Sequence, residues 1–237
     1  PAMDQFVNQA AKIRYMFGGQ ATLPVTFRAA MMYGMGIGAH HSDRPYPMFM
    51  NVPGLKIVAP ASAFDAKGLL KAAIRDDNPV LCFEDASLWM CSGHVPAEDY
   101  IVPLGVADIK RRGRDLTLVG ISGGVRVALE AAEDLAAEGI EAEVVDPRTL
   151  VPLDIDTIVR SVARTRYLVV VDPAHQTCGA SAEICTRVVE LAFDSLRAAP
   201  VRVNTPDIQI PFAPEMEVPL YPNRARVAET VRKLLGA

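Results

Sequence analysis

The sequence lacks an excess of basic residues. Its 24 lysines and arginines stand against 28 aspartates and glutamates, which gives a net charge of −4 and a pI near 5.6. Nucleic acids and anionic membrane surfaces favour proteins with a basic face. The charge balance therefore argues against both kinds of partner.

Long apolar runs are also missing. No stretch approaches the roughly 18 consecutive apolar residues that a membrane-spanning helix needs. The chain does not open on a basic segment followed by an apolar one, as a secretory signal does. We therefore expect no membrane segment and a cytoplasmic location. The opening residues 1–4 do not look like a natural start, so we expect further residues upstream.

Cysteine is scarce and never closely spaced. The four cysteines are Cys82, Cys91, Cys178 and Cys185, and no two form a C-x-x-C pair. A structural zinc site would need ligands at tighter spacing. The pattern is typical of reduced, mostly buried thiols in an intracellular protein.

The sequence is rich in hydrophobic residues, which make up half of the 237 positions. Such a chain can bury a core in one large or two modest domains. The predicted strands are residues 24–27, 55–58, 80–83, 116–119, 142–145, 167–171 and 201–203. The predicted helices are residues 3–17, one capped by Ser62 and Asp65, 125–136, 154–163, 181–196, and one capped by Asn223.

The alternation of these strands and helices predicts an α/β fold with parallel sheets covered by helices. Residues 85–104 show no periodicity and are interpreted as a linker. We therefore expect two α/β units, residues 1–104 and residues 105–237.

A loop rich in glycine and methionine, residues 29–43, is the most informative stretch. Its G-x-G-x-G spacing differs from the G-x-G-x-x-G of dinucleotide sites. His40 and His41 follow a strand, at a place where α/β proteins gather ligands, and histidine suits acid–base work. Three interpretations stay open: proton transfer, a histidine held in a turn, and a metal site with Asp43. Ser42 lacks the G-x-S-x-G context of a hydrolase nucleophile.

Two further acidic segments allow more than one interpretation. Asp76, Asp77 and Asn78 form a polar helix stop, or they help the last helical carbonyls to hold a hard cation, because carboxylates beside a helix C-terminus need compensation. Asp172 ends a strand beside His175 and is either a functional acid or a polar turn residue, and we favour the turn.

Several blocks of sequence occur in the order found in one enzyme family. They are residues 3–19, 38–42, 52–60 and 65–80 in the first unit, and 115–119, 144–149 and 179–184 in the second. Together they resemble β subunits of thiamine-diphosphate-dependent 2-oxo acid dehydrogenases of the pyruvate, branched-chain and acetoin type. The resemblance implies part of a transketolase-type pyrimidine-binding domain followed by a transketolase C-terminal-like three-layer α/β/α domain.

The resemblance also implies a reaction and its partners. Such enzymes decarboxylate a 2-oxo acid oxidatively and pass the acyl group to a lipoyl group, using thiamine diphosphate with magnesium. An α subunit grips the diphosphate through a Gly-Asp-Gly motif that this sequence lacks, so we expect activity only with an α subunit. A second β subunit and a lipoyl-bearing acyltransferase are the other implied partners.

The family pattern assigns roles to a few residues. His41 takes the place of the active-site histidine. Ala73, Ile74, Asp76 and Asn78 take the place of a structural potassium site. The family glutamate that activates the cofactor's pyrimidine ring is expected upstream of Pro1, so no cofactor-binding residue is assigned.

Departures from the family pattern keep other functions open. Ala29 and Ala30 stand where the family has Gly-Pro, Asp43 replaces a glutamine, and Asn51 lies where a histidine is common. The alternatives are a transketolase-like split enzyme, an acetoin dehydrogenase β subunit, and a dimerisation module without catalysis.

Overall fold

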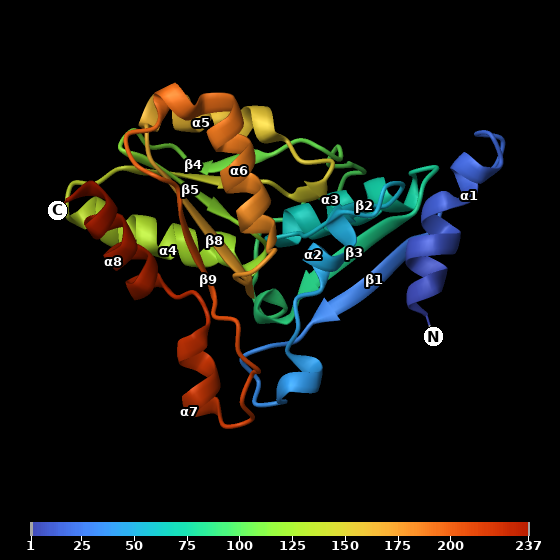
Figure 1. The fold of residues 1–237 in the computed structure, drawn as a ribbon, viewed down its shortest axis with the longest axis horizontal. Coiled ribbons are helices and arrows are strands. Elements are labelled where there is room, and N and C mark those ends of the chain that lie inside the picture. The colour runs from blue at the N-terminus through green and yellow to red at the C-terminus, as the bar shows by residue number, and fades with distance from the viewer. Residues whose placement is uncertain (1, 237) are drawn as a thin grey trace.

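A computed structural model describes residues 2–236 and contains two β-sheets with their covering helices (Figure 1). The strands are β1 (Thr26–Met31), β2 (Lys56–Val58), β3 (Val80–Asp85), β4 (Asp108–Arg111), β5 (Leu116–Gly120), β6 (Ala142–Asp146), β7 (Thr149–Val151), β8 (Leu168–His175) and β9 (Val201–Thr205). The helices are α1 (Ala11–Met16), α2 (Tyr46–Met50), α3 (Ala63–Ile74), α4 (Gly123–Ala137), α5 (Ile155–Thr165), α6 (Ala180–Ala192), α7 (Pro214–Glu217) and α8 (Arg224–Leu235). A π-helical segment, Gln5–Ala10, leads into α1.

The first sheet has the strand order β1-β3-β2-β7. β1 and β2 both pair with β3 in parallel, and β7 adds to β2 antiparallel. The carboxyl ends of the three parallel strands therefore lie at one edge of the sheet. That edge is where an α/β protein of this kind gathers its functional side chains.

The second sheet has the order β4-β6-β5-β8-β9, parallel except for β4. Its central strands are buried throughout. Helices α4 and α8 pack on one face, and α5 and α6 pack on the other (Figure 1). The expected α/β class and the three layers of the second unit are confirmed.

Every predicted strand and helix is present, with some changes of extent. The strand predicted at 24–27 runs on to Met31, so residues 29–31 belong to β1 and not to the loop. The caps at Ser62 and Asn223 are confirmed, because their side chains accept hydrogen bonds from the amides of Asp65 (3.1 Å) and Arg226 (3.0 Å). Four elements were not predicted: β4, β7, α2 and α7. No helix within residues 2–236 is long and apolar enough to cross a membrane.

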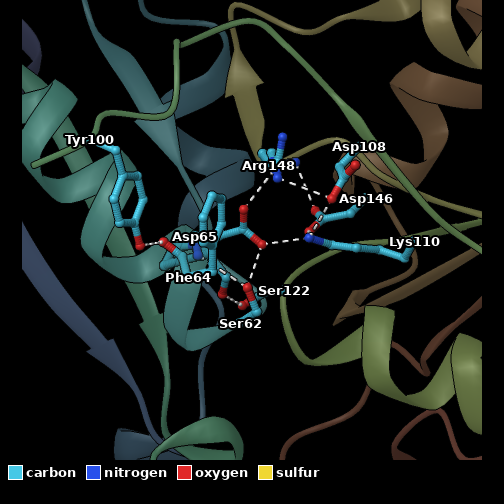
Figure 2. Close-up of polar contacts among 10 residues, drawn as sticks. Ser62, Phe64, Asp65, Tyr100, Asp108, Lys110, Ser122, Asp146 and Arg148 are labelled. Carbon is cyan, nitrogen blue, oxygen red and sulfur yellow. Dashed lines mark hydrogen bonds and ion pairs between the residues drawn. The ribbon is translucent and has the colours of Figure 1, made fainter. Parts of the chain in front are cut away.

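The two units meet at a cluster of charges, which we call the interdomain ion cluster: the buried Asp65 and Asp146 with the partly exposed Asp108, Lys110 and Arg148 (Figure 2). Asp65 begins α3 in the first unit, and its carboxylate pairs with Lys110 Nζ at 2.6 Å and Arg148 Nε at 2.7 Å. Both cations also contact Asp108, at 2.8 and 3.0 Å. The cluster therefore joins α3 to β4 and to the end of β6.

β7 ties the units together a second time. It comes from residues 149–151, yet it completes the first sheet by pairing with β2. The division of the chain near residue 104 stays a prediction, and the structure adds that the two stretches of sequence share one sheet.

Candidate functional site

The glycine-rich loop leaves β1 at the carboxyl edge of the first sheet. Gly34, Gly36 and Gly38 have φ angles of +69°, +64° and +74°. These angles lie in the left-handed region, which side chains other than glycine rarely adopt. The alternating glycines therefore shape a tight loop, and the dinucleotide interpretation finds no support in this geometry.

His40 and His41 lie in a single 3₁₀ turn, Ala39–His41. Ser42 closes the turn, since its hydroxyl donates to the carbonyl of Gly38 at 2.8 Å. Both imidazoles are exposed, and neither makes a side-chain hydrogen bond within residues 2–236. They are free to meet a ligand or a partner chain.

The metal interpretation of this loop is not supported. Over residues 2–236, no group of three or more histidine, cysteine, aspartate or glutamate side chains could hold a metal ion. Asp43 is exposed beside the turn. Of the interpretations left open for His40 and His41, proton transfer and a histidine in a turn remain.

Glu217, at the end of α7, holds the loop from the second unit. Its carboxylate is fully buried and accepts hydrogen bonds from the amides of Gly34 at 2.7 Å and Gly36 at 2.8 Å. The hydroxyl of Tyr221 donates to the same carboxylate at 2.7 Å. Figure 1 shows α7 beside the loop that follows β1.

Arg44 fixes the other end of the loop. Its guanidinium carbon lies 4.0 Å from the ring centre of Tyr33 and 4.4 Å from that of Tyr221. Nη1 donates to the carbonyl of Ser42. Nε and Nη2 are buried and have no hydrogen-bond partner among residues 2–236, so the two ring faces stabilise the charge. The ring of Tyr33 comes from the first unit and that of Tyr221 from the second.

Asp85, the last residue of β3, is a third anchor. It is buried and accepts hydrogen bonds from Tyr33 Oη at 2.5 Å, the amide of Ser87 at 2.9 Å and the amide of Gly123 at 3.0 Å. Burial raises the pKa of Tyr33, and the charge of Asp85 raises it further, so the phenol stays a donor. Asp85 therefore links the loop to the first turn of α4.

A hollow of about 220 Å³ lies at the same sheet edge. Its walls come from the loop after β2, the start of α3 and the segment after β3; they are residues 60–63, Ala66, Glu84, Asp85, Leu88, Trp89 and Cys91. His41 does not line it. The structure therefore places His41 at the edge of the first sheet without enclosing it in a cavity.

The residues expected at a potassium site lie together at the end of α3. The carboxylate of Asp76 contacts the ammonium of Lys56 and accepts from the amide of Asn78 at 2.9 Å and from its side chain at 3.0 Å. Burial raises the pKa of Asp76, but the bonds from Lys56 and Asn78 outweigh it, so the net pKa is lowered. Both oxygens of the Asp76 carboxylate therefore already accept hydrogen bonds within this segment.

Asp172 is a buried structural residue. Its carboxylate accepts hydrogen bonds from the amides of Ala174 at 2.9 Å and Ser181 at 3.0 Å, and from the hydroxyl of Tyr46. β8 runs on to His175, so the prediction that Asp172 ends the strand and lies in a turn is wrong. All four cysteines are free, although Cys91 and Cys178 are exposed and do not fit the prediction of burial.

Two α/β units of this kind, joined through a shared sheet, define the transketolase class of architecture. The family model described as "Transketolase, pyrimidine binding domain" matches residues 3–90, and "Transketolase, C-terminal domain" matches residues 105–227. The solved structure "Split gene transketolase, inactive beta4 tetramer" superimposes with a TM-score of 0.73 over 90% of this chain and 66% of that one. At 24% identity it supports the fold alone.

Individual relatives show to which family within this class the chain is similar. The chain is 44% identical, over 98% of its length and 68% of the relative, to acetoin:2,6-dichlorophenolindophenol oxidoreductase subunit beta of Bacillus subtilis. It is 46% identical to the protein of that name from Cupriavidus necator, over 98% of its length and 69% of the relative. The pyruvate dehydrogenase E1 component subunit beta of Bos taurus is 41% identical, over 99% of this chain and 67% of the relative.

This chain belongs to the family of β subunits of thiamine-diphosphate-dependent 2-oxo acid dehydrogenases. The relatives favour that family over a transketolase-like split enzyme and over a dimerisation module without catalysis.

Glu217, Arg44, Tyr33 and Asp85 are site residues that the sequence analysis missed. One signal for Glu217 was available: it is a carboxylate within a short apolar stretch that contains Phe212, Met216 and Val218. The departures at Ala29, Ala30 and Asp43 all fall on exposed positions, outside these anchors.

Proposed function

We propose that this chain, assembled with an α subunit, decarboxylates a 2-oxo acid oxidatively and passes the acyl group to a lipoyl group. The identity of 41 to 46% to β subunits along nearly the whole chain carries the proposal. The exposed His41, on a loop that three buried anchors hold, is consistent with it.

Thiamine diphosphate, when bound, supplies the carbanion chemistry. The residues of this chain fit part of a binding site for this cofactor. His41 lies on the loop that follows β1 at the carboxyl edge of the first sheet. Asp85 is the buried carboxylate at that edge, and it already accepts three hydrogen bonds from the protein. A pyrimidine ring also needs a carboxylate partner, and we assign that role to no residue between 2 and 236.

His41 is proposed to carry a proton on a ring nitrogen during acyl transfer. Histidine can both accept and donate protons near neutral pH. Its ring makes no side-chain hydrogen bond to residues 2–236, so both nitrogens stay available to a substrate or an acceptor. Ser42 and Gly38 hold the turn beneath it.

The proposed partners follow from the tasks that the subunits of such an enzyme divide between them. The sequence has no Gly-Asp-Gly, so an α subunit is proposed to bind the diphosphate and magnesium. A second β subunit and a lipoyl-bearing acyltransferase complete the proposed assembly.

Potassium is proposed at the end of α3. The ligands would be main-chain carbonyls or side-chain oxygens of Ala73, Ile74, Asp76 and Asn78. Oxygen donors at the negative end of a helix suit a hard cation.

The proposal is tested with the full-length chain co-expressed with its α subunit. Reduction of 2,6-dichlorophenolindophenol or of a lipoyl domain is measured with pyruvate, branched 2-oxo acids and acetoin, and release of carbon dioxide is measured with the 2-oxo acids. We expect turnover of a 2-oxo acid that requires both subunits. Assembly with bound cofactor but no turnover of any 2-oxo acid would contradict the proposal.

His41→Ala tests the assigned residue. A positioned acid–base group typically contributes about 10²- to 10⁴-fold in rate, so we expect a loss of that order in transfer to the lipoyl acceptor. His40→Ala is the matched control, because His40 is an exposed imidazole in the same turn. Equal rates for the two variants would remove His41 from the reaction.

A further inference from the structure

The carboxylate of Glu217 is the point at which the second unit grips the histidine-bearing loop. It accepts hydrogen bonds from the amides of Gly34 and Gly36, which lie 183 and 181 residues away in the sequence. Tyr221 supplies a third donor from the same segment of chain. A fully buried carboxylate with three donors is a fixed anchor and not a mobile surface charge.

The loop needs such an anchor because of its composition. Glycine loses more conformational freedom on ordering than any other residue, so a loop with glycine at every second position is costly to fix. A Cβ on Gly36 would lie 3.3 Å from the carbonyl oxygen of Phe212, which shows how closely the loop packs on the segment before α7.

The anchored stretch leads directly to the candidate catalytic residue. From Gly36 the chain passes Gly38, whose carbonyl accepts from Ser42 Oγ, and reaches the turn that bears His41. Among residues 2–236, Glu217 makes no hydrogen bond or ion pair with either histidine, so it acts on the imidazole through the backbone.

We propose that Glu217 is a positioning residue, which sets the place of His41 by holding the amides of Gly34 and Gly36 across the two units. This inference rests on the proposed role of His41 in acyl transfer. The ionised form of Glu217 is the one that accepts all three bonds. Burial raises its pKa, but the bonds from Tyr221, Gly36 and Gly34 outweigh it and the net pKa is lowered.

Glu217→Gln separates the anchor from the fold. Its amide keeps the shape of the side chain but offers one acceptor oxygen, so one of the two loop amides must face an NH₂ group. Hydrogen bonds to charged groups are the strong ones, and a displacement of about 1 Å can cost about 10²-fold in rate. We expect kcat to fall about 10- to 100-fold in the assembled enzyme, with KM changed by no more than about 3-fold.

The matched control is Glu215→Gln. It removes the same charge from the same short helix, where Glu215 is exposed and makes no side-chain hydrogen bond to residues 2–236. Tyr221→Phe is the gentler variant, because it removes one donor to Glu217 and keeps the ring against Arg44. We expect Glu215→Gln to keep the kcat of the wild type and Tyr221→Phe to lower kcat about 3-fold.

The decisive measurement is a double-mutant cycle with His41→Ala. If Glu217 acts through His41, Glu217→Gln and Tyr221→Phe change kcat little once His41 is absent. Hydrogen exchange gives a readout without turnover: the amides of residues 32–43 should exchange faster in Glu217→Gln, and those of the second sheet should not.

Each outcome bears on one claim. A rate for Glu217→Gln equal to that of Glu215→Gln overturns the inference, and so does an equal loss with and without His41. If Glu217→Gln fails to assemble, Tyr221→Phe decides by the same cycle. A full rate for His41→Ala refutes the proposed role of His41 instead, and with it the inference that rests on that role, while absent turnover in the wild-type assembly refutes the proposed function.

Discussion

Asp146 offers a direct test of the interdomain ion cluster through the pH dependence of stability. It is fully buried at the end of β6, and its carboxylate lies 3.5 Å from Lys110 Nζ. Desolvation raises the pKa of Asp146 to about 7, against the opposing pull of Lys110. The cluster holds three carboxylates and two cations, so a proton on one acid balances its charge.

The sign follows from where the proton is bound. Below about pH 7 the folded protein holds a proton on Asp146 that the unfolded chain, with a pKa of 3.8, has released. The folded state binds more protons, so the free energy of unfolding falls as the pH rises through this window. At about 1.4 kcal/mol for each unit of pKa, the loss between pH 5 and pH 8 is about 2.5 kcal/mol.

Asp146→Asn removes this titration and keeps an oxygen for the amide of Arg148, which the aspartate accepts at 2.8 Å. Urea unfolding of the assembled protein at a series of pH values measures the slope. We expect the wild type to lose about 2.5 kcal/mol more than the variant between pH 5 and pH 8. Asp194→Asn, at an exposed position, should keep the wild-type slope. Parallel slopes for wild type and Asp146→Asn would refute the assignment.

Two further predictions address other parts of the chain. Gly54→Ala should lower the free energy of unfolding by about 2 to 4 kcal/mol, because a Cβ there would lie 1.9 Å from the carbonyl oxygen of Ala11 at a φ of +99°. The control is Gly139→Ala, where φ is +85° but the space around the Cβ is open. It shows the backbone strain alone and should cost about 1 kcal/mol in the same denaturation experiment. If potassium binds at the end of α3, the melting temperature should be higher in potassium chloride than in N-methylglucamine chloride at equal ionic strength, by an amount equivalent to about 2.7 kcal/mol at 100 times the dissociation constant. Equal melting curves in the two salts would contradict the site.

The regular elements were predictable because their signals are local. A buried parallel strand is a short apolar run, and an amphipathic helix repeats its apolar residues every three or four positions. Ser62 and Asn223 mark helix starts through hydrogen bonds within four residues of sequence. Such patterns need no knowledge of the rest of the chain.

The unpredicted elements depend on distant partners. β4 is a sheet-edge strand in which every residue except Ile109 is charged, and the place of Lys110 is explained only by its ion pairs with Asp65 and Asp146. β7 has three residues and is a strand only because β2 lies next to it. Local propensity is weak in segments of this length, so tertiary contacts decide them.

The candidate site divides in the same way. The glycine-rich loop drew attention to His40 and His41 together, and only the family resemblance chose His41 and gave it a role. Glu217 could not be placed, because its partners are backbone amides, which carry no sequence signature of their own. The same holds for Asp85, whose contacts reach Tyr33 and the start of α4.

The contacts that hold the loop make the candidate site depend on both units of this chain. Glu217 and Tyr221 grip the loop from the second unit, and Asp85 caps α4 from the first. β7 and the interdomain ion cluster fix the two units against each other, so a shift of one would move these anchors. The position of His41 is therefore a property of both units, and the second acts as part of the candidate active site without supplying a reacting group.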